Sequence, residues 1–138
     1  MENSRSRCPI NLTVEVIGDK WSLIIIRGIM FDGKRHFREL LNSEEKIASN
    51  ILTDRLNMLE REGIITKRAD PDHKQKYIYS LTAAGIDLLP LMVEIGAWSL
   101  KHRDVDPAKG EHAAMLVKGG KELQKEIRKN LVKEHLRN

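Results

Sequence analysis

Residues 47–82 constrain the fold of this chain more than any other stretch. Apolar residues recur at helical spacing over 48–62, and Gly63 ends that helix. Two short strand candidates, 64–70 and 76–81, then flank a charged turn. The order helix, strand, turn, strand predicts a mainly α-helical fold that carries one small β-hairpin.

The residues before this stretch contain three further helix candidates, 10–17, 20–31 and 36–42. Within the second candidate, the run 23–26 is apolar on too many sides for a surface helix, so we expect it at the buried centre of the fold. A strand is the alternative for such a run, but the apolar pattern continues past strand length. The polar residues 43–46 then form a turn before the next helix.

Two helices joined by a short turn and followed by a β-hairpin form a winged helix-turn-helix. In that fold the second helix enters a groove of DNA, and the hairpin, or wing, touches the neighbouring backbone. The polar face of helix 48–62 carries side chains that suit this role. Asn50, Thr53 and Asn57 suit hydrogen bonds to base edges, and Ser49 near the helix start suits a phosphate.

Helix 48–62 carries three carboxylates against two arginines, so its affinity for DNA must come from elsewhere. Basic residues flank the helix on both sides, and we expect them to contact phosphates: Lys34, Arg35 and Arg38 before the helix, and Lys67, Arg68, Lys74 and Lys76 on the hairpin. Arg55 lies at the edge of the apolar face and is expected to be a structural ion-pair partner. A polar helix face can also be simply solvated, but its position before a charged hairpin argues against that reading.

A long helix is expected over 83–102, and it is apolar on two faces. Leu88, Leu91, Met92, Ile95 and Trp98 form one face, and Ile86, Leu89, Val93, Ala97 and Leu100 form the other. One face can pack on the core of its own chain, and the simplest cover for the other is a second copy, with Gly96 permitting a close approach. The sequence therefore predicts a homodimer. Residues 104–110 form a linker, and 111–136 a final amphipathic helix weakened by two adjacent glycines.

The composition narrows the class of protein. The net charge of +4 and the pI near 9.3 are compatible with a nucleic-acid partner without requiring one. Cys8 is the only cysteine, which excludes an intrachain disulfide and a Cys-based zinc site. The histidines are scattered and no nucleotide-binding or catalytic motif is present, so we expect no metal, no cofactor and no enzymatic activity. Neither a membrane span nor a signal peptide is expected, which predicts a cytoplasmic location.

Several separated segments recur in an order that resembles the HxlR-type winged-helix transcriptional regulators, distant relatives of the MarR type. They are Cys8 with Pro9, VEVIGDKWSLIIIRGIMF (14–31), KRHFREL (34–40), IASNILTDRLNMLEREGII (47–65), YIYSLTAAGIDLLP (77–90) and AWSLKHR (97–103). The resemblance covers residues 8–103 and implies a single DNA-binding and dimerisation domain there, with 104–138 as an added linker and helix.

The resemblance also implies a mode of action. Homodimers held by the first and the long fifth helix, that is by the terminal helices, bind a pseudo-palindrome in double-stranded DNA through helix 48–62 and the wing. They control a neighbouring gene, and repression is expected over activation. The alternative is a winged-helix module that binds a protein instead of specific DNA.

Two positions depart from the family's pattern. Lys74 and Gln75 precede Lys76 where the family usually has a proline pair before an arginine, and Lys46 stands where relatives often have glycine. Lys76 is then the expected minor-groove or phosphate contact, while the shapes of the wing and of the turn can differ from those of relatives.

Some relatives sense oxidants or electrophiles through a cysteine at the position of Cys8. Arg5, Arg7 and the start of a helix would favour the thiolate of Cys8, which makes it a candidate redox sensor. The same cysteine can instead pack at the dimer interface. An oxidant is one candidate effector, and a small apolar molecule held between the long helix and the DNA-binding helices is another; the sequence itself names none.

Overall fold

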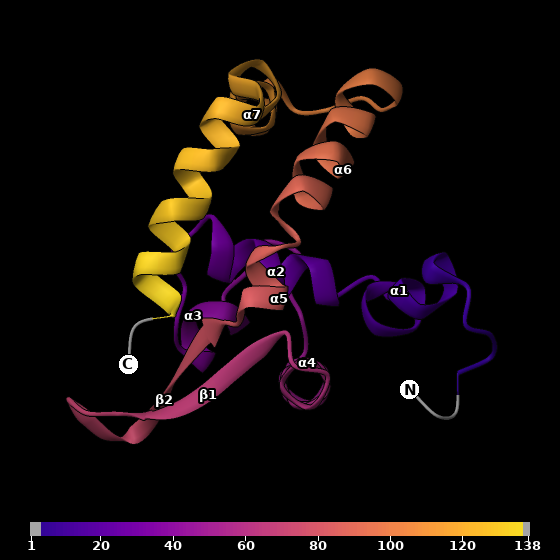
Figure 1. The fold of residues 1–138 in the computed structure, drawn as a ribbon. Helices are drawn as coiled ribbons and strands as arrows, with labels where there is room; N and C mark the ends of the chain where they lie inside the picture. The colour runs from indigo at the N-terminus through magenta and orange to yellow at the C-terminus, as the bar shows by residue number, and fades with distance from the viewer. Residues whose placement is uncertain (1–3, 137–138) are drawn as a thin grey trace. The chain divides into compact units, whose positions relative to one another are not determined.

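The computed structural model of the chain describes residues 4–136 (Figure 1). The chain forms two compact units, one ending at Thr82 and the other beginning at Ala83. The described residues are mainly helical with one two-stranded antiparallel hairpin, as predicted. The division falls earlier along the chain than the expected boundary after residue 103, because the helix that precedes this boundary packs against the helix that follows it.

The helices of the first unit agree with the predicted ones to within two residues at each end. They are α1 (Pro9–Ile17), α2 (Ser22–Met30), α3 (Phe37–Leu41) and α4 (Ser49–Arg61). Pro9 occupies the first turn of α1, where its missing N–H costs no hydrogen bond. The Asp19 carboxylate accepts hydrogen bonds from the backbone N–H groups of Trp21 and Ser22, both at 2.8 Å, and so leads the chain into α2.

Helix α2 is the centre of this unit. Ile25, Ile26 and Ile29 are at most 3% exposed, and no strand forms in this part of the described chain. The interpretation of the isoleucine run as a helix is therefore confirmed. Burying side chains of this size is the main favourable contribution to folding, at about 1.5–3 kcal/mol each.

The wing consists of β1 (Ile65–Asp70) and β2 (His73–Leu81), joined by a turn of two residues. The two strands pair regularly from Ile65 opposite Leu81 as far as Ala69 opposite Tyr77. The next pair is Asp70 opposite His73, so the three residues 74–76 of β2 have no partner on β1. They form a large bulge, which is where the sequence departs from the family's proline pair.

The far end of β2 is more deeply buried than its alternating pattern predicts. Tyr79, Ser80 and Leu81 are consecutive and each is at most 6% exposed, whereas Tyr77 is 49% exposed. The reason is a third backbone segment beside β2, because the Tyr79 N–H donates to the carbonyl of Arg35 at 2.8 Å. The end of the wing therefore enters the core, and only its tip keeps the character of a half-exposed hairpin.

The second unit consists of α5 (Ala83–Ile86), α6 (Leu89–His102) and α7 (Pro107–His135). The single helix expected over 83–102 is interrupted by a turn at residues 87–88. The linker between α6 and α7 is shorter than predicted, because α7 already begins at Pro107. The Asp106 side chain caps this helix start by accepting a hydrogen bond from the Ala108 N–H. Gly120, with φ of 60° and ψ of −155°, kinks α7 at the predicted weak point.

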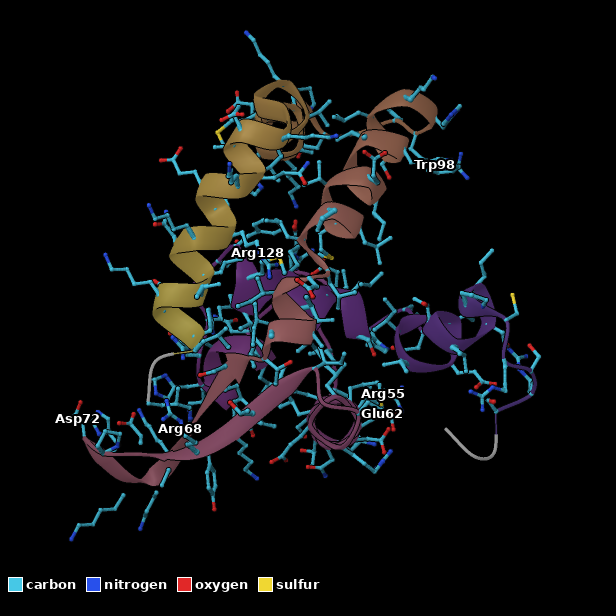
Figure 2. All side chains as sticks on the ribbon, viewed as in Figure 1. Arg55, Glu62, Arg68, Asp72, Trp98 and Arg128 are labelled. Atoms are coloured by element: carbon cyan, nitrogen blue, oxygen red, sulfur yellow. The ribbon has the colours of Figure 1, made fainter. Side chains whose placement is uncertain are left out.

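Gly96 has a different neighbour from the one expected. A Cβ atom placed on Gly96 would lie 3.2 Å from the Cβ of Ala113, so the close approach at this glycine is made by α7 of the same chain. The opposite side of α6 carries an exposed apolar stripe of Leu91, Ile95 and Trp98, exposed by 36%, 40% and 52%. Figure 2 shows Trp98 projecting from α6 on the side away from α7.

The sequence analysis expects no membrane span, but one stretch of the described chain meets the length and composition of a span. Residues 83–102 are long enough and apolar enough to cross a membrane by length and composition, with a mean hydropathy of 1.4. Only 22% of this stretch is buried, and the turn at 87–88 divides it into two helices. The apolar character that predicts an interface helix is thus the same character that meets the criterion for a membrane span.

Candidate nucleic-acid interface

Helix α4 has one apolar and one polar face. Leu52, Leu56 and Leu59 are at most 2% exposed and fix the orientation of the helix. Ser49, Asn50, Thr53 and Asn57 are all exposed. The four side chains expected at base edges and phosphate therefore lie on one accessible helix face. Their contact with DNA stays a prediction.

Arg55 holds this helix to the core, as expected of a structural ion-pair partner. Its guanidinium binds Asp54 of the same helix, with an Nη2–Oδ2 distance of 2.7 Å, and Asp19 before α2, with an Nη1–Oδ2 distance of 3.2 Å. Figure 2 labels Arg55 on α4. The pair with Asp54 also offsets the carboxylate that stands among the predicted base-reading residues.

The turn between α3 and α4 keeps a backbone conformation typical of glycine although it contains Lys46. The φ of Lys46 is 58°, and its N–H donates to the Ser43 carbonyl at 3.1 Å. The side chain of Glu45 in the same turn forms two hydrogen bonds with Arg27 of α2, both 2.8 Å long. These bonds lower the pKa of Glu45 to about 2. Lys46 therefore keeps the left-handed conformation at a cost in local strain, and the bonds between Glu45 and Arg27 hold the turn against α2.

Arg35 has a structural position that does not suit the phosphate contact expected of it. Its Nε donates to the Tyr79 carbonyl at 2.7 Å, and its Nη2 donates to the Ser80 hydroxyl at 2.5 Å. Both acceptors belong to the buried end of β2. The side chain therefore joins the segment before α3 to the wing, and the geometry favours this role over binding DNA.

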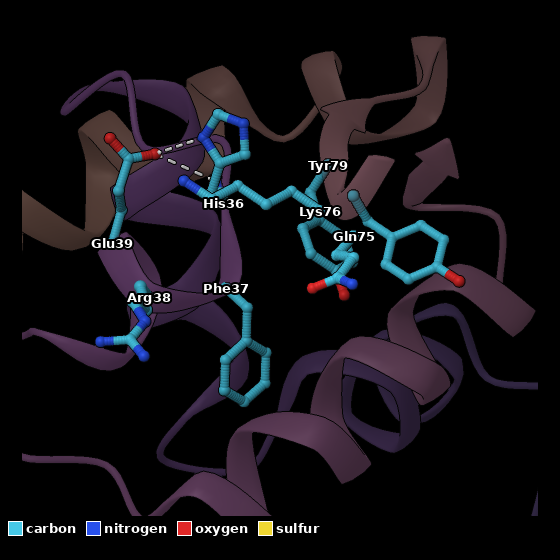
Figure 3. Close-up of a pocket in the computed structure, with 8 residues that line it drawn as sticks. His36, Phe37, Arg38, Glu39, Gln75, Lys76 and Tyr79 are labelled. Carbon is cyan, nitrogen blue, oxygen red and sulfur yellow. Dashed lines mark hydrogen bonds and ion pairs between the residues drawn. The ribbon is translucent and has the colours of Figure 1, made fainter. Parts of the chain in front are cut away.

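The other expected phosphate contacts are on the surface of the same unit. Arg38 on α3 is exposed, as are Lys74 and Lys76 on the bulge of β2. Lys34 is half-buried, and its Nζ lies 3.4 Å from the Asn42 carbonyl, a long hydrogen bond that leaves the ammonium near solvent. Lys67, also on the wing, places its Nζ 4.2 Å from the centre of the Tyr77 ring. The structure brings Arg38 and Lys76 to the same hollow (Figure 3).

The sequence analysis missed His36, which links α3 to the wing. Its Nε2 lies 2.9 Å from Oδ2 of Asp70 at the end of β1, and its Nδ1 lies 3.1 Å from Oε1 of Glu39. The Glu39 carboxylate also accepts from the backbone N–H groups of Arg35 and His36, which lowers its pKa. The spacing of His36 and Glu39 is that of a capping box, which is the signal that could have revealed this role.

Cys8 is exposed and immediately precedes α1. The backbone N–H groups of Asn11 and Ile10 in the first turn of that helix lower the pKa of its thiol. Arg5, expected to favour the thiolate, instead pairs with Glu15 at 3.3 Å. The helix start therefore supplies the effect that the sequence analysis also assigned to arginine. Within residues 4–136, no group of three or more His, Cys, Asp or Glu side chains is placed to hold a metal ion.

A helix-turn-helix whose second helix exposes an amide- and hydroxyl-rich face, next to a cationic β-hairpin, defines a winged helix-turn-helix DNA-binding protein. The model of the HxlR-like helix-turn-helix family matches residues 16–107, and the chain belongs to that family. It is a transcriptional regulator, as the family's members are.

Known proteins with similar sequences or folds agree with this assignment. The Bacillus subtilis (strain 168) protein YdeP, an uncharacterised HTH-type transcriptional regulator, is 35% identical over 97 residues, which cover 70% of this chain and 75% of YdeP. The crystal structure of PA1607 has a TM-score of 0.68 and 31% identity, covering 76% of this chain and 72% of PA1607. The redox regulator HypR in its oxidised form has a TM-score of 0.61 and 34% identity, covering 71% of this chain and all of HypR.

Proposed function

We propose that this protein is a homodimeric transcriptional repressor that reads a pseudo-palindromic DNA site through α4 and the wing. The observation that carries this proposal is the position of the exposed polar face of α4 and the cationic bulge of β2 on one compact unit. Two such helices in one dimer would enter successive major grooves about 34 Å apart. Repression follows if the bound dimer blocks access of the polymerase to a promoter.

Each predicted contact has a distinct task in this proposal. Asn50, Thr53 and Asn57 read base edges, because paired donors and acceptors distinguish one base pair from another. Ser49 binds a phosphate at the start of α4, where backbone N–H groups without helical partners favour an anion. A separate set of cations holds the DNA backbone without reading sequence: Lys34, Arg38, Lys74 and Lys76. Arg35 is left out of this set, because its guanidinium is bonded to β2.

Selection from random double-stranded DNA tests the proposal, with affinities then measured over a range of salt concentrations. The wild type should enrich an inverted repeat with half-sites about one helical turn apart. Asn57→Ala should relax the preference at one base position. Lys76→Ala should weaken all sequences alike and lower the slope of log K against log salt by about 0.9 for each phosphate that the variant no longer binds. Wild-type behaviour of both variants on the selected site would refute the docking model.

The dimer is supported by apolar surface that the described chain does not cover. On α6 this surface is the stripe of Leu91, Ile95 and Trp98, and on α1 it includes Ile10, which is 75% exposed. A contact with a second copy would also account for the membrane-like hydropathy of residues 83–102 in a cytoplasmic protein. Trp98→Glu should shift the protein toward monomer in sedimentation experiments. A variant that remains as dimeric as the wild type would exclude this stripe as the interface.

Cys8 is a candidate sensor of oxidants or electrophiles within this function. The support is its exposed thiol, the lowered pKa due to the N–H groups of Asn11 and Ile10, and the likeness to HypR, a redox regulator. Mild oxidation should change the DNA affinity of the wild type and leave that of Cys8→Ser unchanged. Equal responses of the two proteins would exclude the cysteine as the sensor.

The alternative function is a winged-helix module that binds a protein, and salt discriminates between the two. A DNA-binding protein loses affinity steeply as the salt concentration rises, in proportion to its phosphate contacts. An absence of DNA binding at low salt, with the protein in both redox states, would favour the alternative. The proposal includes no enzymatic activity, metal or cofactor.

A further inference from the structure

A hollow of about 370 Å³ lies within the first unit, between α3 and the bulge of the wing (Figure 3). Its lining includes Phe37 and Arg38 from α3, and Gln75, Lys76 and Tyr77 from β2. The volume is within the range of sites that hold small organic molecules. The proposed reading of base edges by α4 does not use this space, although two of its lining residues, Arg38 and Lys76, are proposed phosphate contacts.

The walls of the hollow are unusually aromatic for this chain. The sequence has only two phenylalanines, two tyrosines and two tryptophans, and three of these six side chains line this one space: Phe37, Tyr77 and Tyr79. Tyr77 is 49% exposed, so its ring contributes little to the core and remains available at the surface. Lys67 stacks over this ring at 4.2 Å and helps to hold it in place. Such walls suit a planar ring, which can stack on aromatic faces.

The charges at the hollow favour an anion. Arg38 and Lys76 reach it from two different elements, and within residues 4–136 neither side chain forms an ion pair. Glu39 also lines the hollow, but its Oε1 already accepts from two backbone N–H groups and lies 3.1 Å from the His36 ring. Gln75 adds an amide that can donate a hydrogen bond. Two cations and one carboxylate therefore line this space, which leaves it with a net positive charge.

We propose that this hollow binds a small aromatic carboxylate as an effector of the regulator. The carboxylate would bind Arg38 and Lys76, and the ring would lie against Phe37 and Tyr77. This inference rests on the proposed function, because Arg38 and Lys76 are also proposed phosphate contacts. A bound anion would neutralise both of them and lower the attraction of the wing and α3 for the DNA backbone. Effector binding and DNA binding would then compete.

Nuclear magnetic resonance tests the site without DNA, using naphthalene-2-carboxylate as the probe and uncharged 2-naphthylmethanol as its matched control. The carboxylate should shift amide signals of residues 36–39 and 75–79, and it should bind about tenfold more tightly than the alcohol, the change expected from a charge-assisted hydrogen bond. Tyr77→Ser should weaken the binding of the carboxylate probe and leave the affinity for DNA unchanged. Shifts centred elsewhere, equal binding of the two probes, or equally tight binding of inorganic phosphate would overturn the proposal.

A second measurement separates failure of the site from failure of the proposed function. The affinity for the selected DNA site is measured with and without saturating naphthalene-2-carboxylate. Weaker DNA binding in its presence, with no such effect in Tyr77→Ser, supports the competition. Unchanged DNA affinity at saturation refutes it. If no DNA binds even without the probe, the proposed function fails, while the spectra still decide whether the hollow binds the anion.

Discussion

Replacement of Arg35 by glutamine separates a structural arginine from a DNA-binding one. In the folded chain the Arg35 guanidinium donates to the Tyr79 carbonyl at 2.7 Å and to the Ser80 hydroxyl at 2.5 Å. Glutamine removes the positive charge and shortens the side chain, so neither bond is kept. Arg38 provides a matched control, because it is exposed and three residues away, and no ion pair holds it in the described part of the chain.

The expected cost follows from the burial of the two acceptors. Tyr79 is 6% exposed and Ser80 is 1% exposed, so water cannot readily replace the missing donor. A hydrogen bond from a charged donor contributes about 1.5–3 kcal/mol, and Arg35→Gln should therefore lower the free energy of unfolding by about 3 kcal/mol. Arg38→Gln should change it by less than about 0.5 kcal/mol, as is usual for exposed positions.

Urea unfolding and the salt dependence of DNA binding together measure the two roles. Arg35→Gln should unfold at lower urea with an unchanged m value, and should keep the wild-type salt slope at temperatures where it is folded. Arg38→Gln should show the reverse, with normal stability and a slope lowered by about 0.9 for each phosphate that it no longer binds. If Arg35→Gln unfolds like the wild type and lowers the salt slope, the structural assignment of Arg35 is wrong.

Three further substitutions test local features of the first unit: two lie in the turn between α3 and α4, and the third is at Gly63 after α4. Lys46→Gly should stabilise the protein by about 0.5 kcal/mol, because relief of the strain at the left-handed φ of 58° exceeds the entropy that glycine adds to the unfolded chain. Gly63→Ala, at a φ of 77° in open space, should destabilise the protein by about 1 kcal/mol. Urea unfolding measures both changes. The hydrogen bonds from Arg27 lower the pKa of Glu45 to about 2 in the folded protein. These bonds therefore stabilise the fold at pH values above the pKa of Glu45 in the unfolded chain, near 4.5, and this stabilisation is lost as the pH falls toward 2. Because the Arg27–Glu45 pair is half-exposed, Glu45→Gln should lower the free energy of unfolding by about 1 kcal/mol at pH 7. Between pH 5 and pH 2 the stability of the variant should fall less than that of the wild type.

Helix positions could be predicted closely because the local chemistry determines them. The apolar period of α4, the proline in the first turn of α1 and the isoleucines of α2 each express a preference of a short segment, and the structure places these helices within two residues of expectation. The exposed face of α4 follows from the same period, since burial of Leu52 and Leu56 determines which residues face outward.

The features that the sequence analysis missed depend on partners that are distant along the chain. Arg35 bonds to residues 44 and 45 positions away, and nothing in its own segment distinguishes it from Lys34. The bulge at 74–76 depends on how β2 pairs with β1, and the strand pattern alone does not give that register. Periodicity showed that α6 has two apolar faces, but it could not show that α7 approaches Gly96 and leaves the Trp98 stripe exposed.

The arrangement of charge on α4 matters more for DNA binding than its total. Between residues 47 and 62 the carboxylates outnumber the arginines by one, which left a protein-binding module open as the alternative to DNA binding. Two of these carboxylates, Glu60 and Glu62, lie at the C-terminal end of the helix, beyond the predicted base-reading residues. The third, Asp54, is bound by Arg55, so the segment from Ser49 to Asn57 presents a balanced charge. The repulsion inferred from the total is therefore largely absent where the helix would meet DNA, and the cations of α3 and the wing can supply the attraction.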